Sequence, residues 1–140
     1  MLIDTHVWIW AADGGARLGA KARRRLARPP VRYAGDLLAI SAASVFEVVA
    51  LHTAGRLRFA VPVERWVRES IEKGGLQVLD LEREIAVDAA MIPSSALPDP
   101  IDRMLVATAR EYDLPLVTAD RKVLDYGKRT GLVRVVDASA

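Results

Sequence analysis

Apolar positions along the chain occur in two patterns, as short continuous runs and as longer stretches with helical spacing. The short runs predict buried strands at residues 2–3, 37–40, 76–81, 114–118 and 133–136. The helical stretches lie between them, at residues 5–11, 17–28, 42–53, 62–73, 82–91, 100–112 and 121–126. Strands that alternate with helices in this way predict an α/β fold, whose mainly parallel sheet is covered by helices on both faces.

Residues with strong terminal preferences mark the ends of several of these helices. Ser41 is a predicted N-cap, and Asp99 followed by Pro100 is a second start signal. Pro29 and Pro30 end the second helix, because proline cannot continue one. These signals agree with the boundaries that the apolar pattern gives.

The composition is that of a compact globular domain, with 51% hydrophobic and 27% charged residues in a chain of 140. No repeat or dividing linker interrupts it, so we expect one domain over residues 1–140. The absence of cysteine excludes disulfides, thiolate catalysis and zinc–thiolate sites. The chain lacks a signal-peptide pattern and any apolar run long enough to span a bilayer, so we expect a cytoplasmic protein without a membrane partner.

The small net charge hides a separation of charges. There are 20 basic and 18 acidic residues, for a net charge of +2. If four of the acids share one pocket, the remaining surface is basic by about six charges. Such a surface suits a polyanion that lies over an acidic pocket.

Acidic side chains stand where such a fold binds ligands, beyond the carboxyl ends of its parallel strands. Asp4 ends the first predicted strand and Asp120 follows the fourth. Glu47 lies in the helix after the second strand, while Asp99 and Asp102 open the helix before the fourth. All five acids are therefore expected near one edge of the sheet.

Glu47 carries the clearest local signal among these acids. The helix around it is apolar nearly all round between Ala42 and Leu51, so we expect it to be buried. Only Ser44, which shares a face with Glu47, is also polar. A buried carboxylate needs a positive partner, and taken alone a salt bridge to an arginine and a metal ion are equally good explanations.

The other acids each have a structural explanation as well. Asp4 and Asp120 can be N-caps, Asp102 can be a first-turn acid that suits the helix dipole, and Asp99 fits an N-cap better than a ligand. Four carboxylates at one sheet edge repel one another unless a cation intervenes. Oxygen ligands of this kind favour Mg²⁺ and also accommodate Mn²⁺. The set as a whole therefore predicts a metal site.

Other residue types give weaker signals. His6 and His52 lack metal-ligand spacing and are interpreted as structural, and Trp8, Trp10 and Trp66 as core or interface residues. The sequence has no phosphate-binding glycine loop and no Gly-x-Ser-x-Gly elbow.

A basic stretch covers residues 21–28 and carries five positive charges. A stretch of this kind is usually a solvated helix face, and the alternative interpretation is that it contacts nucleic acid. The candidate contacts to RNA are Arg23, Arg24 and, beside an acid of the site, Arg103.

Four motifs together resemble the PIN domain, specifically the VapC-type toxins of bacterial toxin–antitoxin pairs. They are Leu2-Ile3-Asp4-Thr5-His6-Val7-Trp8, the stretch from Ile40 to Val49 around Glu47, the stretch from Asp99 to Ala109, and Leu116-Val117-Thr118-Ala119-Asp120. No single motif is specific, whereas all four in this order are. One departure is that Leu97-Pro98 leads straight into Asp99, where relatives often have a histidine-containing run.

The resemblance implies an α/β/α sandwich around a five-stranded parallel sheet and a Mg²⁺- or Mn²⁺-dependent endoribonuclease. It also implies a homodimer that is neutralised by a cognate VapB-type antitoxin. The catalytic metal ligands carried over by position are Asp4, Glu47, Asp102 and Asp120, with Thr118 as a supporting hydroxyl and Asp99 as an accessory acid. Ser44, which shares the face of Glu47, is a further accessory candidate.

Three other functions compete with this one. A phosphoacceptor receiver domain would need more acids after the first strand and a lysine after the fifth, which the sequence lacks. A non-catalytic binding module of the same fold is disfavoured by the complete acid set. A structure-selective DNA nuclease would use the same chemistry, in which an activated water attacks in line and leaves 5′-phosphate and 3′-hydroxyl ends.

Overall fold

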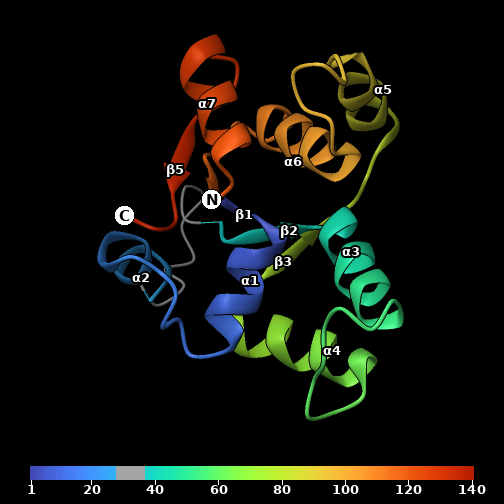
Figure 1. Ribbon diagram of the computed structural model, residues 1–140, viewed down its shortest axis with the longest axis vertical. Coiled ribbons are helices and arrows are strands. Elements are labelled where there is room, and N and C mark those ends of the chain that lie inside the picture. Colours follow the sequence, from blue (N-terminus) through green and yellow to red (C-terminus); the bar gives the residue numbers. More distant parts are fainter. Residues whose placement is uncertain (28–36) are drawn as a thin grey trace.

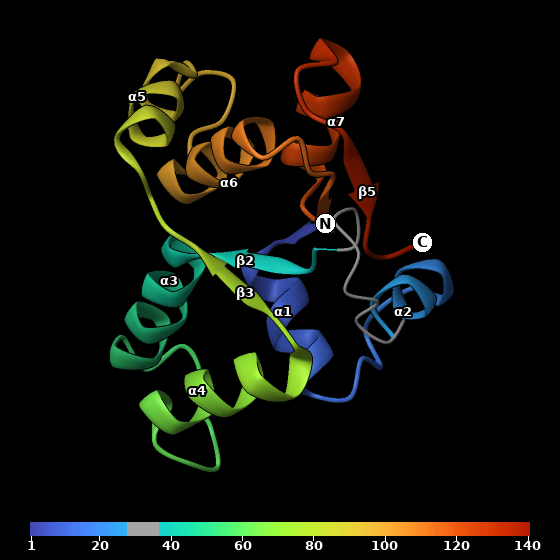
Figure 2. The same cartoon turned by 180° about the vertical axis from the view of Figure 1, so that it is seen from behind.

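The computed structural model describes residues 1–27 and 37–140, which form a five-stranded parallel sheet. The strand order is β3-β2-β1-β4-β5, and β3 and β5 lie at opposite edges (Figure 2). The strands are β1 (Leu2–Ile3), β2 (Ala39–Ser41), β3 (Gln77–Leu79), β4 (Leu116–Thr118) and β5 (Val135–Asp137). The predicted parallel sheet is therefore confirmed, and β2 to β5 are shorter than the apolar runs that predict them.

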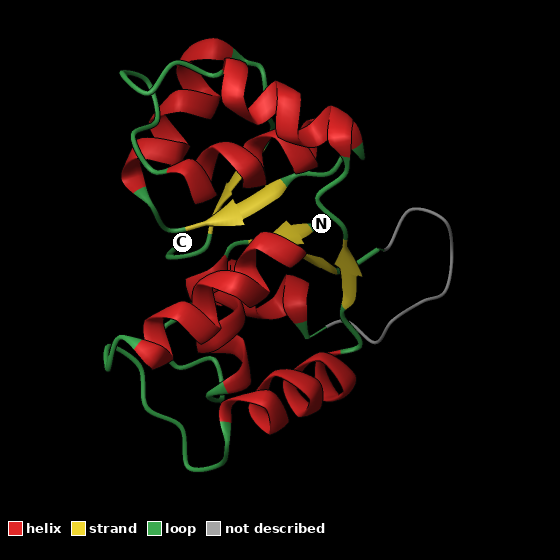
Figure 3. Ribbon diagram, turned by 90° about the vertical axis from the view of Figure 1, so that its right-hand side faces the viewer, coloured by secondary structure: helices red, strands yellow, loops and turns green. Residues whose placement is uncertain are grey.

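Helices cover both faces of the sheet, which confirms the predicted α/β/α sandwich. They are α1 (Thr5–Ala12), α2 (Ala20–Leu26), α3 (Ala42–Thr53), α4 (Val63–Gly74), α5 (Arg83–Met91), α6 (Pro100–Glu111) and α7 (Arg121–Thr130). The first four lie on one side of the sheet and the last three on the other (Figures 1 and 3). No helix in the described ranges combines the length and the apolar character that a membrane crossing requires.

Alternation along each strand builds a separate core on each face of the sheet. Leu2 and Leu116 point into the core under α6 and α7. Their neighbours Ile3 and Val117 point into the core under α1 to α4. That second core contains Trp8, which is 1% exposed, as its prediction as a core residue requires.

Helix boundaries follow the predicted signals closely, with two larger differences. Ser41 Oγ accepts a hydrogen bond of 3.0 Å from the Ala43 N–H and caps α3 as predicted. The second helix begins at Ala20 rather than at residue 17, and the prediction that Pro29-Pro30 ends it lies outside the described residues. The last helix continues to Thr130, where Gly131 with φ 66° ends it.

The expectation that α3 is buried all round is wrong. Phe46 on this helix is 67% exposed, whereas Ser44 and Val48 are fully buried. The helix lies at the end of its layer (Figure 1), and within the described structure one of its faces is buried while Phe46 is exposed on another. The apolar sequence of α3 therefore covers an inner face and also leaves apolar side chains at the surface.

Candidate metal centre

Four elements bring acidic side chains to the carboxyl end of the sheet. Asp4 ends β1 and caps α1, while Asp120 follows the adjacent strand β4 and caps α7. Asp102 lies in the first turn of α6, and Glu47 lies in the second turn of α3. The charges of Asp4, Asp120 and Glu47 all raise the pKa of Asp102, which shows that the four acids share one electrostatic environment.

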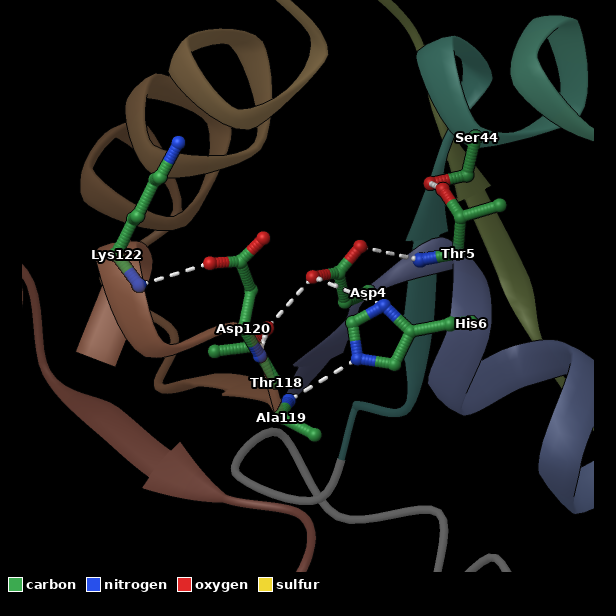
Figure 4. Close-up of polar contacts among 8 residues, drawn as sticks. All are labelled: Asp4, Thr5, His6, Ser44, Thr118, Ala119, Asp120 and Lys122. Carbon is green, nitrogen blue, oxygen red and sulfur yellow. Dashed lines mark hydrogen bonds and ion pairs between the residues drawn. The ribbon is translucent and has the colours of Figure 1, made fainter. Parts of the chain in front are cut away.

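Asp4 is the most enclosed of these acids, with 4% of its surface exposed. Its Oδ1 accepts a hydrogen bond of 2.6 Å from the Thr5 N–H, and its Oδ2 accepts one of 2.6 Å from the Thr118 hydroxyl (Figure 4). Burial raises the pKa of Asp4 more than the nearby His6 and these two hydrogen bonds lower it. A buried carboxyl held at both oxygens has a fixed orientation.

Asp120 is positioned by hydrogen bonds to its backbone and to one side-chain oxygen. The Asp120 N–H donates a hydrogen bond of 3.0 Å to Thr118 Oγ1. Asp120 Oδ1 accepts one of 2.8 Å from the Lys122 N–H, as an N-cap does (Figure 4). The hydroxyl of Thr118 thus contacts both acids at the ends of β1 and β4.

Glu47 is half-buried and faces other acids. Burial raises its pKa, the Thr5 side chain lowers it as a hydrogen-bond donor, and the charges of Asp4 and Asp99 raise it further. The same Thr5 hydroxyl lies 2.9 Å from Ser44 Oγ (Figure 4). In residues 1–27 and 37–140 Glu47 forms no ion pair with an arginine, so the salt-bridge explanation is excluded for the described part of the chain.

The carboxyl of Asp102 also has a strongly raised pKa. Burial and then the charges of Asp4, Asp99, Asp120 and Glu47 raise its pKa to about 8. Asp99 itself is exposed and caps α6, since its Oδ1 accepts a hydrogen bond of 2.8 Å from the Ile101 N–H. Its predicted role as a helix cap is confirmed, and its charge still reaches the site.

The donor set fits a hard divalent cation. Carboxylates that raise the pKa of one another lose that repulsion when a cation lies between them. Among the described residues, no group of three or more His, Cys, Asp or Glu side chains is placed as the ligands of one metal ion. Mg²⁺ and Mn²⁺ keep several waters and need only a few carboxylates from the protein, so they are the ions that fit this chemistry.

Two residues at the site were not predicted to take part in it. Thr5 bridges Asp4 and α3, and His6 Nε2 accepts a hydrogen bond of 3.0 Å from the Ala119 N–H. His6 Nδ1 lies 3.5 Å from Asp4 Oδ2 (Figure 4). The sequence could have indicated both residues, because they directly follow Asp4 and the first turn of α1 must therefore lie beside the end of β1.

In the described part of the chain, none of the three predicted RNA contacts forms an ion pair with an acid of this cluster. Arg23 on α2 donates hydrogen bonds to the carbonyl oxygens of Ala16 and Leu18. Arg24 is exposed on the same helix. The Nε atom of Arg103 on α6 is buried without a hydrogen-bond partner in the described structure. No arginine in the described part of the chain is among the main influences on the pKa values of Asp4, Glu47 and Asp102, so the three arginines remain predictions as RNA contacts.

Known proteins resemble this chain in sequence and in fold. A family model described as the PIN domain matches residues 1–129. The chain is 32% identical over 123 residues to Ribonuclease VapC22 of Mycobacterium tuberculosis, and the match covers 88% of each chain.

Two solved structures extend the likeness in fold at lower identity. A toxin–antitoxin complex from Klebsiella pneumoniae has a TM-score of 0.62 at 21% identity, covering 98% of this chain and 96% of that one. VapBC2 from Rickettsia felis, bound to a DNA fragment from its promoter, has a TM-score of 0.65 at 13% identity, with 96% of each chain covered.

Proposed function

Because the chain belongs to the PIN-domain family, we propose that it is a divalent-metal-dependent endoribonuclease and the toxin of a type II toxin–antitoxin pair. The observation that carries the proposal is the convergence of Asp4, Glu47, Asp102 and Asp120 from four elements, with the pKa of Asp102 raised to about 8 by its acidic neighbours. The relative named as a ribonuclease supports RNA as the substrate.

The proposed mechanism assigns the four acids to holding Mg²⁺ or Mn²⁺. When bound, the ion supplies a Lewis acid that activates water and stabilises charge on the phosphate. With its pKa raised to about 8, Asp102 favours the protonated form at neutral pH, and a bound cation would favour its charged carboxylate instead. Thr5 and Thr118 keep the carboxylate of Asp4 in one orientation throughout.

The proposal extends to the partners of the protein. We propose that the chain acts in the cytoplasm as one nuclease domain over residues 1–140, forms a homodimer and is neutralised by a VapB-type antitoxin. The toxin–antitoxin complexes among the structural neighbours support the antitoxin, since their fold is the fold of this chain. Arg23, Arg24 and Arg103 are the arginines proposed to meet the RNA backbone.

The function is tested with purified protein and a panel of cellular RNAs in the presence of Mg²⁺ or Mn²⁺. We expect internal cleavage that leaves 5′-phosphate and 3′-hydroxyl ends, and loss of cleavage with a chelator or in Asp4→Asn. Asp125→Asn, on the exposed face of α7, is the matched control and should cleave normally.

Several outcomes would contradict the proposed function. Products with 2′,3′-cyclic phosphate ends would mean that the ribose hydroxyl, not water, attacks. Cleavage of matched DNA but not RNA would identify a DNA nuclease. Binding of RNA without cleavage at any metal concentration would identify a non-catalytic module.

A further inference from the structure

His6 lies between two of the segments that carry the acids of the site. Its Nε2 accepts a hydrogen bond of 3.0 Å from the N–H of Ala119, the residue between Thr118 and Asp120. Its Nδ1 lies 3.5 Å from Asp4 Oδ2 on the other side (Figure 4). Its ring also packs on Trp10, at a centroid distance of 4.9 Å. The imidazole therefore connects the end of β1 with the residue that follows β4.

The hydrogen bond from Ala119 decides which nitrogen of His6 faces Asp4 as a donor. A ring nitrogen that accepts a hydrogen bond carries no proton, so the proton of the neutral imidazole is on Nδ1. The N–H of Nδ1 then points toward the carboxylate. The distance of 3.5 Å is long for a hydrogen bond, so the contact orients the carboxylate through electrostatics.

The two oxygens of Asp4 are consequently not equivalent toward a cation. Oδ2 accepts the Thr118 hydroxyl at 2.6 Å and has the His6 ring on its other side. Among the described residues, Oδ1 accepts a hydrogen bond only from the Thr5 N–H, at 2.6 Å, which leaves one lone pair. Asp120 shows the same asymmetry, because Oδ1 accepts the Lys122 N–H and Oδ2 has no hydrogen-bond partner among the described residues.

We propose that His6 is a positioning residue, which ties Asp4 to the Ala119–Asp120 backbone and orients Asp4 so that only Oδ1 ligates the divalent cation. The inference rests on the proposed function, since the cation is the one proposed there. Such a histidine differs from an ordinary metal ligand, because it acts on the carboxylate and not on the ion. Partners of this kind change metal affinity about 10- to 100-fold when they are removed.

The test measures Mn²⁺ binding without RNA, by electron paramagnetic resonance, in the wild type and in variants of His6. His6→Ala should weaken binding on the order of 10-fold. His6→Asn should restore most of the affinity, because its amide N–H reaches the position of Nδ1. His6→Gln places its terminal amide near Nε2 instead, so it should keep the contact with Ala119 and restore less. His52→Asn is the control, since His52 bonds Leu57 O and packs on Phe59.

Two results would overturn the inference. One is wild-type Mn²⁺ affinity in His6→Ala, and the other is equal affinity in the Asn and Gln variants, which a merely space-filling ring would give. Thermal unfolding of each variant identifies any loss of fold, and the comparison of Asn with Gln decides the matter if the Ala variant does not fold.

A second measurement separates this inference from the proposed function. The nitrogen spectrum of metal-free protein labelled with ¹⁵N-histidine should show the neutral ring of His6 with its proton on Nδ1, and His52→Asn removes the other histidine signal. A proton on Nε2 would overturn the inference. A wild type that binds no Mn²⁺ would overturn the proposed function, while the ring tautomer would still decide the role of His6.

Discussion

The hydroxyl of Thr118 donates a hydrogen bond of 2.6 Å to Asp4 Oδ2 and accepts one of 3.0 Å from the Asp120 N–H. One side chain on β4 therefore fixes both the carboxylate at the end of β1 and the backbone of the acid that follows β4. Thr118 is fully buried and Asp4 is 4% exposed, so water cannot replace the bond between them.

Thr118→Val should weaken both the fold and the metal site. Valine keeps the shape but leaves Asp4 Oδ2 without its short donor, which costs about 1–3 kcal/mol for a buried group. Urea unfolding measures that loss, and Mn²⁺ titration measures the loss of affinity. Thr108→Val is the control, because Thr108 is equally buried and its hydroxyl, within the described structure, bonds only Met104 O in its own helix. Equal Mn²⁺ affinity in the two variants would contradict the role given to Thr118.

Stability of the metal-free protein should fall as the pH rises. Folding raises the pKa of Asp102 from 3.8 to about 8, so within that window the folded state keeps a proton that the unfolded chain has released. The pKa values of Asp4 and Glu47 are raised as well and act in the same direction. Partial exposure of Asp102 keeps the slope below the limit of about 1.4 kcal/mol per pH unit.

Asp102→Asn should therefore raise the stability of the metal-free protein, although the same substitution should abolish RNA cleavage in the presence of metal. In EDTA, the variant should exceed the wild type in urea unfolding at about pH 8, by a margin that shrinks toward about pH 6. Acids with lowered pKa values, such as Glu69 and Asp137, change the stability only at pH values below the range of about pH 6 to about pH 8. Identical pH profiles for the variant and the wild type would show that Asp102 is an ordinary surface acid.

The order of elements was predictable because each strand and helix has its own local pattern. Strand lengths were not, since apolar residues also occur where no strand pairs. Leu37 and Leu114 belong to the predicted strands, yet both lie outside β2 and β4 and pack against the core under α6 and α7. An apolar run indicates that a segment is buried, whereas the segment belongs to the sheet only where it forms hydrogen bonds with a neighbouring strand.

Local sequence patterns likewise predict one part of the site, whereas the other part depends on which strands pair. Glu47 stood out because an acid in an apolar helix is a local anomaly. The contact of His6 with Ala119 joins residues 113 positions apart, and it exists only because β1 pairs with β4. No local pattern encodes which strands become neighbours, so the roles of Thr5 and His6 required the structure.

Gly127→Ala should destabilise the packing of α7 on β5, although alanine favours helices. A Cβ at this position would lie 2.6 Å from Val135 Cγ1 and 3.1 Å from Val133 O. Overpacking costs about 1–3 kcal/mol, more than the roughly 1 kcal/mol that helix propensity returns. The double variant with Val135→Ala should recover stability in urea unfolding, since it removes the nearest atoms. A Gly127→Ala protein as stable as the wild type would mean that α7 and β5 can move apart at no cost.

Mn²⁺ should raise the melting temperature more at about pH 8 than at about pH 6. Binding requires the charged form of Asp102, whose pKa of about 8 in the metal-free protein means that protons compete with the ion at lower pH. Thermal unfolding with and without Mn²⁺ at each pH measures this difference. Asp102→Asn should show little shift at either pH, while Asp125→Asn should behave as the wild type. A shift that is independent of pH in the wild type would place the bound ion away from Asp102, because only an ion near this carboxyl has to displace its proton.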